Sequence, residues 1–464
     1  MSLRIYNSLT RSVEDFVPRE DKRVQMFVCG PTVYDFIHLG NARTFTVFDV
    51  VARWLRHRGY DVAYLQNITD IDDRIIVRSA ERGEDALAYA RTFDDAFRAD
   101  MHALGNDAVS QFARASDHIP EVRAQVKRLI ETGHVYQVED GWYFDLATFP
   151  DYGKLSGRTV VEAEDAVSRI DDSSKKRNAG DFCVWKLSKP GEPVWDDDQL
   201  GAGRPGWHIE DTAITEKYFG PQYDLHGGGT DLKFPHHEAE IAQQESASGK
   251  IPFVKYWMHA GFLEGAAGKM SKSKGAATPL REALAAHPAA AIRFFFLSNH
   301  YRAPLQFTDA SLDAAEAATQ RIAELMAKSR AFQSSGHDEA GIMAAISSAR
   351  AAFEDAMDND FNTPVAFSAL FSLITQANKA ITENAFGMES QAALREFFSM
   401  VSDQLGIVPP ADSAVPDDVR ALVDERQRVR ESKDFSAADE LRDRIIALGY
   451  SVDDTPYGPL VKKK

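Results

Sequence analysis

The first seventy residues combine two kinds of hydrophobic pattern. Residues 24–28 form a short apolar run rich in β-formers, and a Cys-Gly-Pro sequence at 29–31 interrupts it. From about Asn41 onward, apolar residues recur at every third or fourth position until Gly59. Residues 61–68 are strand-like again. The pattern therefore predicts a β-α-β unit with a polar first loop.

Further segments of the same α/β kind follow along the chain. Between about 110 and 200 the pattern loosens, with alternating strand-like residues at 134–144, and this predicts an insertion within the fold. The other segments are predicted as a helix at 82–104, a strand followed by a glycine-rich turn within 223–232, a helix from Pro235, a strand at 256–260 and a helix at 283–299.

After about residue 305 the spacing becomes helical throughout. Alanine-rich helices are predicted at 310–331, 340–357 and 363–381, followed by a Pro- and Asp-rich linker at 408–417, two short helices at 417–433 and 436–448, and a turn-rich tail at 453–458. We therefore expect a Rossmann-type α/β domain at 1–304 with its insertion, an α-helical bundle at 305–407, and a small C-terminal α+β module at 416–464.

Composition narrows the class of protein. The 464 residues are 44% hydrophobic, but no run of eighteen apolar residues and no signal-peptide pattern occurs, so we expect a soluble, cytoplasmic protein without a membrane partner. Only two cysteines, Cys29 and Cys183, are present, and a cytosolic compartment argues against their pairing. The net charge of −17 argues against a nucleic-acid partner, although a local basic face can coexist with an acidic remainder.

The loop before the first predicted helix carries His38, Gly40 and Asn41. A helix N-terminus offers N–H groups and positive dipole to a phosphate, and Gly40 lets a ligand come close. His38 and Asn41 can donate hydrogen bonds to an oxygen that gains charge. A second polar segment, Lys-Met-Ser-Lys-Ser at 269–273, offers lysines to a leaving pyrophosphate. Taken alone, the first segment is more typical of a polar strand-to-helix turn, and the second could be a solvated basic loop.

Three residues could hold a metal ion. His236 and Glu240 are four apart, so they lie on one helical face, and Cys29 stands at the end of the first strand, where strand ends of one sheet edge converge. A thiolate, an imidazole and carboxylates suit zinc. Spacing alone leaves an ordinary surface pair and a buried, packing cysteine as alternatives.

Together, the His-Leu-Gly-Asn and Lys-Met-Ser-Lys-Ser segments resemble the paired signature of class I aminoacyl-tRNA synthetases. The whole chain is similar to cysteinyl-tRNA synthetases. The matching blocks are 27–35, 38–43, 67–73, 203–210, 226–232, 234–243, 269–274, 360–364 and 433–443. The resemblance implies activation of L-cysteine by ATP with Mg²⁺, followed by transfer of the cysteinyl group to the terminal adenosine of cysteine tRNA.

The resemblance also implies one Zn²⁺ per chain, which selects cysteine through its thiolate. Its ligands would be Cys29, position 211, His236 and Glu240. Position 211 is Asp, where the family usually has Cys. Asp211 either replaces the missing ligand or marks a site that depends less on zinc, and we favour the first alternative.

Further roles carry over from the matching blocks. His38 and Asn41 would stabilise the α-phosphate, and Lys269 and Lys272 would hold the β- and γ-phosphates, as catalytic residues. The expected contacts are Gly40, His226, Gly227, Gly228, Gly229, Asp231 and Lys272 with ATP, Gly30, Thr69 and Trp207 with cysteine, and Arg430, Asp439 and Asp454 with the tRNA anticodon. The three tRNA positions are equally consistent with helix surface charges.

Two other functions remain open at this level. A cysteine ligase that acts on an amino sugar in thiol biosynthesis shares the adenylation site but lacks an anticodon module, so residues 416–464 favour the synthetase. A non-catalytic tRNA-binding paralogue would not need both intact signature segments. The family is expected to be monomeric.

Overall fold

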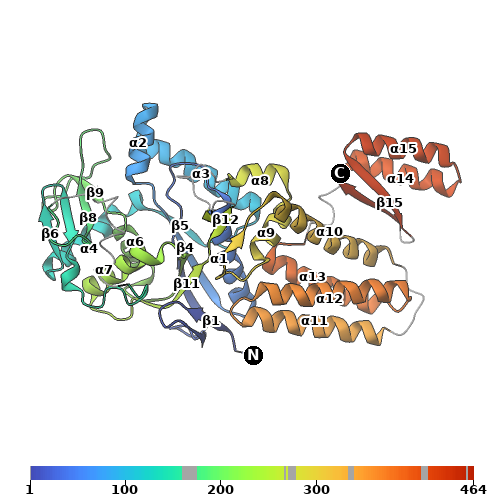
Figure 1. Cartoon of the computed structure of the whole chain (residues 1–464), viewed down its shortest axis with the longest axis horizontal. Coiled ribbons are helices and arrows are strands. Elements are labelled where there is room, and N and C mark those ends of the chain that lie inside the picture. Colours follow the sequence, from blue (N-terminus) through green and yellow to red (C-terminus); the bar gives the residue numbers. More distant parts are fainter. Residues whose placement is uncertain are drawn as a thin grey trace. The chain divides into compact units, whose positions relative to one another are not determined.

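The computed structural model describes residues 2–158, 175–265, 268–269, 278–332, 339–408, 416–455 and 458–463. The chain divides into two compact units. The first consists of Met1–Ala286, Asn299–Thr308 and Asp358–Phe361, and the second of His287–Ser298, Asp309–Met357 and Asn362–Lys464. In Figure 1 the first unit contains sheets with helices around them, and the second is mainly helical.

A five-stranded parallel sheet forms the centre of the first unit. Its strand order is β11-β10-β3-β4-β5. The strands are β3 (Arg23–Val28), β4 (Asp61–Ile68), β5 (Gln111–Arg114), β10 (Tyr223–Gly229) and β11 (Val254–Ala260). Most of their residues are buried, as expected for a parallel sheet that helices cover on both faces. This arrangement confirms the predicted Rossmann-type α/β fold.

The helices of this unit connect and cover the strands. They are α1 (Leu39–His57), α2 (Asp73–Arg82), α3 (Ala86–Leu104), α4 (Ile119–Glu131), α6 (Ile209–Phe219), α7 (Glu238–Ser248) and α8 (Leu280–Ala286), with single turns η1 (Ala115–His118), η2 (Leu146–Thr148) and η3 (Lys233–His237). Helix α1 begins two residues before the predicted position because His38 caps it. The His38 ring nitrogen Nδ1 accepts from the backbone N–H groups of Gly40 and Asn41.

Three predicted elements have other limits in the structure. The helix predicted at 82–104 is α3 alone, since Gly83, in the left-handed region at φ 67°, ends a separate helix α2. The glycine-rich turn is wrong: β10 continues through Gly229 and stays paired with β11 as far as Ala260. The helix predicted at 283–299 is two helices, α8 and α9 (Ala289–Leu297), with Pro288 between them.

The region predicted as an insertion begins with a strand of the central sheet. β5 pairs with β4 in parallel, so residues 111–114 belong to the α/β core. Beyond β5 lies a four-stranded antiparallel sheet in the order β6-β7-β8-β9, made of β6 (Val135–Val138), β7 (Gly141–Phe144), β8 (Phe182–Leu187) and β9 (Gly203–Pro205). Shorter strands complete the unit: β1 (Arg4–Asn7), β2 (Ser12–Asp15), β12 (Leu263–Gly265), β13 (Gly268–Lys269) and β14 (Leu305–Gln306).

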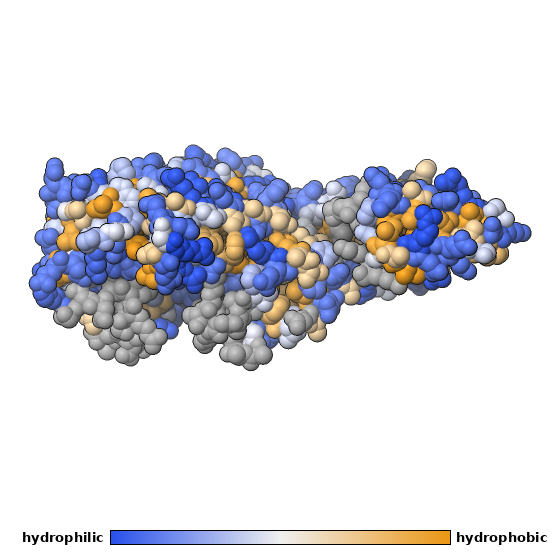
Figure 2. Space-filling model, turned by 90° about the horizontal axis from the view of Figure 1, so that it is seen from above, coloured by the Kyte–Doolittle hydropathy of each residue, from blue (hydrophilic) through white to orange (hydrophobic). Residues whose placement is uncertain are grey.

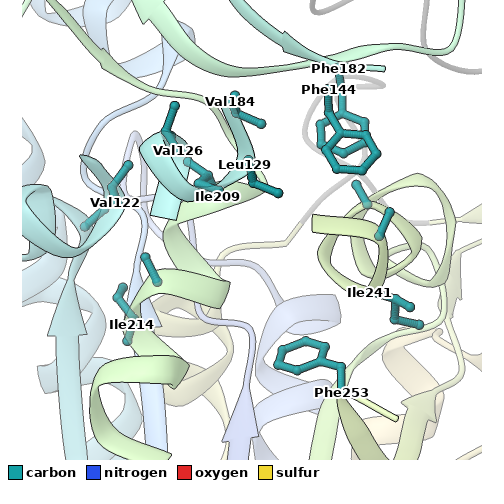
Figure 3. Close-up of a cluster of buried hydrophobic side chains, with 14 of the residues drawn as sticks. Val122, Val126, Leu129, Phe144, Phe182, Val184, Ile209, Ile214, Ile241 and Phe253 are labelled. Carbon is teal, nitrogen blue, oxygen red and sulfur yellow. The ribbon is translucent and has the colours of Figure 1, made fainter. Parts of the chain in front are cut away.

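One hydrophobic core packs α6 and α7, the two helices that carry candidate metal ligands, against their neighbours. Side chains of α4, α6, α7 and β8 gather around it in Figure 3. Phe144 and Phe182 stack there, with ring centroids 5.1 Å apart and planes 4° apart. The labelled aliphatic members are Val122, Val126, Leu129, Val184, Ile209, Ile214 and Ile241. Because Ile209 and Ile241 are fully buried, this core fixes the neighbouring turns of α6 and α7.

The second unit is helical apart from one hairpin. Its long helices are α10 (Asp309–Ala331), α11 (Ala340–Asp358), α12 (Thr363–Thr382) and α13 (Met388–Leu405), and α13 was not predicted. The C-terminal helices are α14 (Asp417–Glu431) and α15 (Phe435–Ala447). β15 (Tyr450–Thr455) and β16 (Gly458–Lys463) form an antiparallel hairpin after these helices, which gives the predicted α+β module its β part. Residues 453–455 and 458 of the predicted turn-rich tail belong to these strands.

The surface is mainly hydrophilic where Figure 2 shows it, with hydrophobic residues in small separate patches. This agrees with the net charge of −17. None of the helices in the described part of the chain is both long and apolar enough to cross a membrane.

Candidate metal centre and nucleotide site

Four donor side chains converge at the carboxyl edge of the central sheet. Cys29 directly follows β3, Asp211 lies in the first turn of α6, His236 lies in η3 and Glu240 in α7. The His236 Nε2 atom is 3.0 Å from Asp211 Oδ2 and 3.1 Å from Glu240 Oε1. The Cys29 Sγ atom is 3.5 Å from Asp211 Oδ2 and 3.9 Å from Glu240 Oε1. One ligand atom of each residue lies within 4.8 Å of all the others.

These donors are buried together. Cys29, Asp211, His236 and Glu240 are between 0 and 5% exposed. Burial raises the pKa of the Cys29 thiol well above its usual range, and the carboxylates of Glu240 and Asp211 raise it further. Burial and the carboxylate of Asp211 likewise raise the pKa of Glu240. Burial thus disfavours the charged forms of the Cys29 thiol and the Glu240 carboxyl, and a bound cation would favour their deprotonated, ligating forms.

The donor set fits a divalent metal ion. Sulfur, imidazole nitrogen and carboxylate oxygen are the ligands that Zn²⁺ takes in proteins. The second carboxylate oxygen of Glu240, Oε2, is buried without a hydrogen-bond partner among the described residues. Asp211 lies in the first turn of α6, where the helix dipole favours negative charge. Residues 29, 211, 236 and 240 are thus a chemically reasonable set of metal ligands.

Two further histidines, His226 and His237, lie beside Cys29, and this changes the interpretation of His226. We expected this residue at ATP, but its ring is fully buried, with Nε2 3.4 Å from Cys29 Sγ and Nδ1 2.6 Å from the Tyr223 hydroxyl. His237 Nε2 is 3.2 Å from Cys29 Sγ. Cys29, His226, His237 and Glu240 therefore form a second group of suitable spacing.

Sequence reasoning missed His237 and its neighbour His259. The pair is linked, with His237 Nδ1 2.9 Å from His259 Nε2. Burial lowers the pKa of His226 and His237 well below the usual value, and that of His259 to about 3, so these rings are neutral. The pair of adjacent histidines, His236 and His237, was the only hint of this in the sequence. That the two rings face different partners depends on the bent turn η3, which a hydrophobic pattern does not reveal.

The residues expected to contact cysteine lie around the same donors. Trp207 stacks on the His236 ring, with centroids 4.5 Å apart. Thr69 is buried, and its hydroxyl donates to the carboxylate of Glu210. At Gly30 a Cβ atom would lie 1.8 Å from the carbonyl oxygen of Asn67, so only glycine fits. The structure thus brings all three residues close to the candidate metal ligands.

The N-terminus of α1 carries three of the residues that we expected at the nucleotide. His38 Nδ1 accepts from Gly40 N at 3.0 Å and from Asn41 N at 3.4 Å, which places the ring proton on Nε2. A Cβ atom at Gly40 would lie 2.9 Å from the His38 ring. The first turn of α1 therefore combines a positive dipole end with a side-chain donor, as an anion site requires.

The glycines of β10 have a packing role. A Cβ atom at Gly227 would lie 2.3 Å from the Phe48 ring, and one at Gly228 would lie 2.9 Å from the His237 ring. One at Gly229 would lie 2.5 Å from Asp231 Oδ1, directly beyond the strand. The close approach of α1 and η3 to β10 therefore explains Gly227 and Gly228 independently of any ligand.

The lysine segment is mostly outside the described residues. Lys269 ends β13, while Lys272 and the remainder of 270–277 belong to the part that the structure does not describe.

Two of the three expected tRNA contacts are paired with each other in the C-terminal module. Arg430 Nη1 is 2.8 Å from Asp454 Oδ2. Arg426, which sequence reasoning missed, donates to both carboxylate oxygens of Asp454 at 2.6 and 2.8 Å. Asp439 is exposed on α15. The structure thus groups Arg430 and Asp454 on the hairpin side of α14, with Arg426 as their buried support.

Comparisons with known proteins cover the whole chain. A family model described as the tRNA synthetases class I (C) catalytic domain matches residues 15–317. Models described as the DALR domain and the cysteinyl-tRNA ligase anticodon binding domain match residues 352–408 and 412–458.

Among curated proteins, the chain is 44% identical to the cysteine–tRNA ligase of Heliobacterium modesticaldum over 485 residues, covering 100% of both chains. It is 40% identical to that of Thermococcus onnurineus, covering 100% of this chain and 99% of the relative. Among solved structures, Mycobacterium tuberculosis methionyl-tRNA synthetase in complex with methionyl-adenylate aligns with a TM-score of 0.62 at 17% identity, covering 83% of this chain and 92% of that one. This structural likeness shows the fold alone.

Proposed function

This chain belongs to the cysteine–tRNA ligase family of class I aminoacyl-tRNA synthetases, and from that premise we propose that it joins L-cysteine to cysteine tRNA in two steps. The carboxylate of cysteine attacks the α-phosphate of ATP, which forms cysteinyl-adenylate and releases pyrophosphate. A ribose hydroxyl of the terminal adenosine of the tRNA then attacks the acyl carbon, and AMP leaves. The anticodon-binding match at 412–458 supports this function over an amino-sugar ligase without such a module.

We assign cysteine selection to the buried donors Cys29, Asp211, His236 and Glu240, and we propose Zn²⁺ as their metal. The convergence of sulfur, nitrogen and oxygen donors supports this assignment. A bound Zn²⁺ would supply a Lewis acid that prefers a thiolate to a serine hydroxyl. The residues around it shape the pocket: Trp207 covers His236, and Thr69 and Gly30 border the donors.

We assign adenylate formation to the start of α1 and to the lysine segment. The capping bond at Nδ1 leaves the His38 ring proton on Nε2, so His38 can donate to the α-phosphate as its charge grows. Asn41 and Gly40 complete this side of the site. Lys269 and Lys272 would hold the β- and γ-phosphates together with Mg²⁺, and Gly229 and Asp231 would border the adenosine. Phosphoryl transfer depends mostly on such positioning and charge stabilisation.

We propose that the bundle at 305–407 and the module at 416–464 bind tRNA, with Arg430, Asp439 and Asp454 at the anticodon. The grouping of Arg430 with Asp454 supports a shared recognition surface. ATP and tRNA are cytoplasmic substrates, so we place the protein in the cytoplasm, and we expect a monomer.

The convergence of Cys29, Asp211, His236 and Glu240 beside Thr69 and Trp207 is the observation that carries the proposal. It is tested by measuring zinc content together with ATP–pyrophosphate exchange on the purified protein. We expect about one zinc per chain and exchange that requires L-cysteine, with L-serine as the matched control substrate.

Exchange without bound zinc would show that cysteine is selected by another route, and the metal assignment would be wrong. Absence of cysteine-dependent exchange despite full zinc occupancy would instead favour a non-catalytic protein.

A further inference from the structure

A single buried amide links two of the four candidate metal ligands. Asn67, near the end of β4, is 2% exposed. Its Oδ1 atom accepts from the backbone N–H of Gly30 at 2.5 Å, and Gly30 directly follows Cys29. Its Nδ2 atom donates to Asp211 Oδ1 and, at 3.3 Å, to Glu210 Oε1. The same side chain therefore contacts the backbone beside Cys29 and the carboxylate of Asp211.

The orientation of this amide follows from its partners. The backbone N–H of Gly30 only donates, so the atom of Asn67 that faces it has to be the acceptor oxygen. The amide NH₂ then necessarily faces the carboxylates of Asp211 and Glu210. Exchange of the two atoms would place a donor against a donor and an oxygen against two carboxylates.

Because of this hydrogen bond, the two carboxylate oxygens of Asp211 have different partners. Oδ1 is occupied by the Asn67 amide, while Oδ2 lies 3.0 Å from His236 Nε2 and 3.5 Å from Cys29 Sγ, among the other donors. A carboxylate fixed in this way presents one oxygen to a metal ion and not two.

We propose that Asn67 is a positioning residue that holds Asp211 as a one-oxygen metal ligand. The proposal rests on the proposed function only in that Asp211 binds the metal. Because sulfur is a weak acceptor, a cysteine at 211 would gain little from the Asn67 amide, so the residues at 67 and 211 should be energetically coupled.

The test is a double-mutant cycle on zinc affinity in the full chain. Asn67→Ala, Asp211→Cys and the double variant are compared with the parent protein by competition with a chromophoric zinc chelator. We expect Asn67→Ala to weaken Zn²⁺ binding by about 10- to 100-fold, as loss of an outer-shell partner typically does. In the Asp211→Cys background the same change should alter affinity by less than about threefold.

A spectroscopic measurement separates positioning from general stability. Co²⁺ replaces Zn²⁺, and its visible bands are intense in four-coordinate sites and weaker in five-coordinate ones. Asn67→Ala releases Asp211 Oδ1, so we expect this substitution to weaken and shift the Co²⁺ bands in the parent background. In the Asp211→Cys background the same substitution should leave the bands unchanged.

Two further variants control for folding. Asn67→Asp keeps an oxygen for the Gly30 N–H but removes the donor to Asp211, so it should weaken zinc binding at least as much as Asn67→Ala. Asn106→Ala removes another buried amide, whose Nδ2 donates to Thr46 Oγ1 at 3.1 Å, and it should leave zinc affinity unchanged.

The outcomes distinguish this proposal from the proposed function. Equal losses in both backgrounds, or parental zinc affinity in Asn67→Asp, would show that Asn67 does not act through Asp211 and would overturn the positioning role. If Asp211→Ala keeps parental zinc affinity, Asp211 is not a ligand, and both this proposal and the ligand assignment are wrong. Loss of zinc in Asp211→Ala together with unchanged binding in Asn67→Ala overturns the positioning role alone.

Discussion

At the scale of single residues, Asp211 is the position that tests the proposed metal site most directly. It is 1% exposed, lies in the first turn of α6, and meets His236 and Cys29. An oxygen ligand is harder than a sulfur ligand and transfers less electron density to zinc, so under the proposed assignment Asp211 would preserve the number of ligands and make the metal a stronger Lewis acid. The surrounding polar contacts fit a carboxylate that ligates.

Asp211→Ala should therefore lower zinc affinity by more than about 100-fold, beyond the effect typical of outer-shell changes, and raise the KM for cysteine. Asp211→Cys is the matched control and should retain tight zinc binding. The measurements are zinc content after dialysis and the cysteine dependence of pyrophosphate exchange. Full zinc content with an unchanged KM in Asp211→Ala would remove Asp211 from the ligand set.

The two ring nitrogens of His38 allow its observed capping role to be separated from its proposed catalytic role. Nδ1 caps α1, and Nε2 carries the donor proton. His38→Ala should slow cysteine-dependent pyrophosphate exchange by about 10²–10³-fold and lower the free energy of unfolding by about 0.5–2 kcal/mol. His38→Asn supplies a good N-cap without the ring donor, so stability should return while exchange stays slow. Recovery of both properties in His38→Asn would refute a catalytic role for the ring.

At the scale of elements, the close contact of β10 with α1 depends on a single glycine. Gly227 makes this contact possible, since a Cβ atom there would lie 2.3 Å from the Phe48 ring. Gly227→Ala should lower the free energy of unfolding by about 1–3 kcal/mol through overpacking, and Phe48→Leu should relieve part of the loss. Denaturant unfolding measures both variants.

The matched control is Gly341→Ala in α11, where an added Cβ atom has nothing within 4 Å. There the substitution should stabilise by up to about 1 kcal/mol, because alanine favours the helix. Equal effects at the two glycines would contradict the packing explanation for Gly227.

The hairpin of the C-terminal module depends on a charged contact with α14. Hydrogen bonds from Arg426, together with the charges of Arg426 and Arg430, lower the pKa of Asp454 below its ordinary value of 3.8. A lowered folded-state pKa adds stability that is present above the unfolded-state value and is lost as the pH falls through the folded-state value. The protection factors of the amides in α14 and α15, which correct for the slower intrinsic exchange at low pH, should therefore fall below about pH 4.

Asp454→Asn serves as the control, because it abolishes the titrating group. This variant should show lower protection factors already at neutral pH and a smaller further loss of protection on acidification. An unchanged pH profile in Asp454→Asn would show that other carboxyl groups account for the acid sensitivity.

At the scale of the whole molecule, the net charge of −17 is opposed to binding a polyanion. Local arginines therefore have to make the phosphate contacts, and release of counterions makes such contacts salt-dependent. Raising monovalent salt from about 50 to 200 mM should lower the affinity for cysteine tRNA about tenfold or more. Pyrophosphate exchange without tRNA is the control and should change much less. Equal salt sensitivity of both reactions would contradict an electrostatic tRNA interface.

The sequence by itself determined those features that depend on neighbours a few residues apart. The β-α-β periodicity, the His38 turn at the start of α1 and the i, i+4 pair of His236 and Glu240 all follow from local geometry, and the structure reproduces them. The family resemblance added position 211 as a candidate ligand. A motif identifies a position in the chain even when the residue there differs from the family's usual one.

The tertiary structure decided every feature that depends on which surfaces meet. A hydrophobic pattern shows that a residue is buried, but it does not show which residue it packs against. For this reason the pairing of β5 with the central sheet and the contact of His226 with Cys29 both differ from the expectation. Polar contacts across long stretches of chain carry no periodic signal at all. The pairing of Asn67 with Asp211 and of Arg426 with Asp454 therefore emerged only when the elements packed, because directional bonds form between atoms that folding has already brought together.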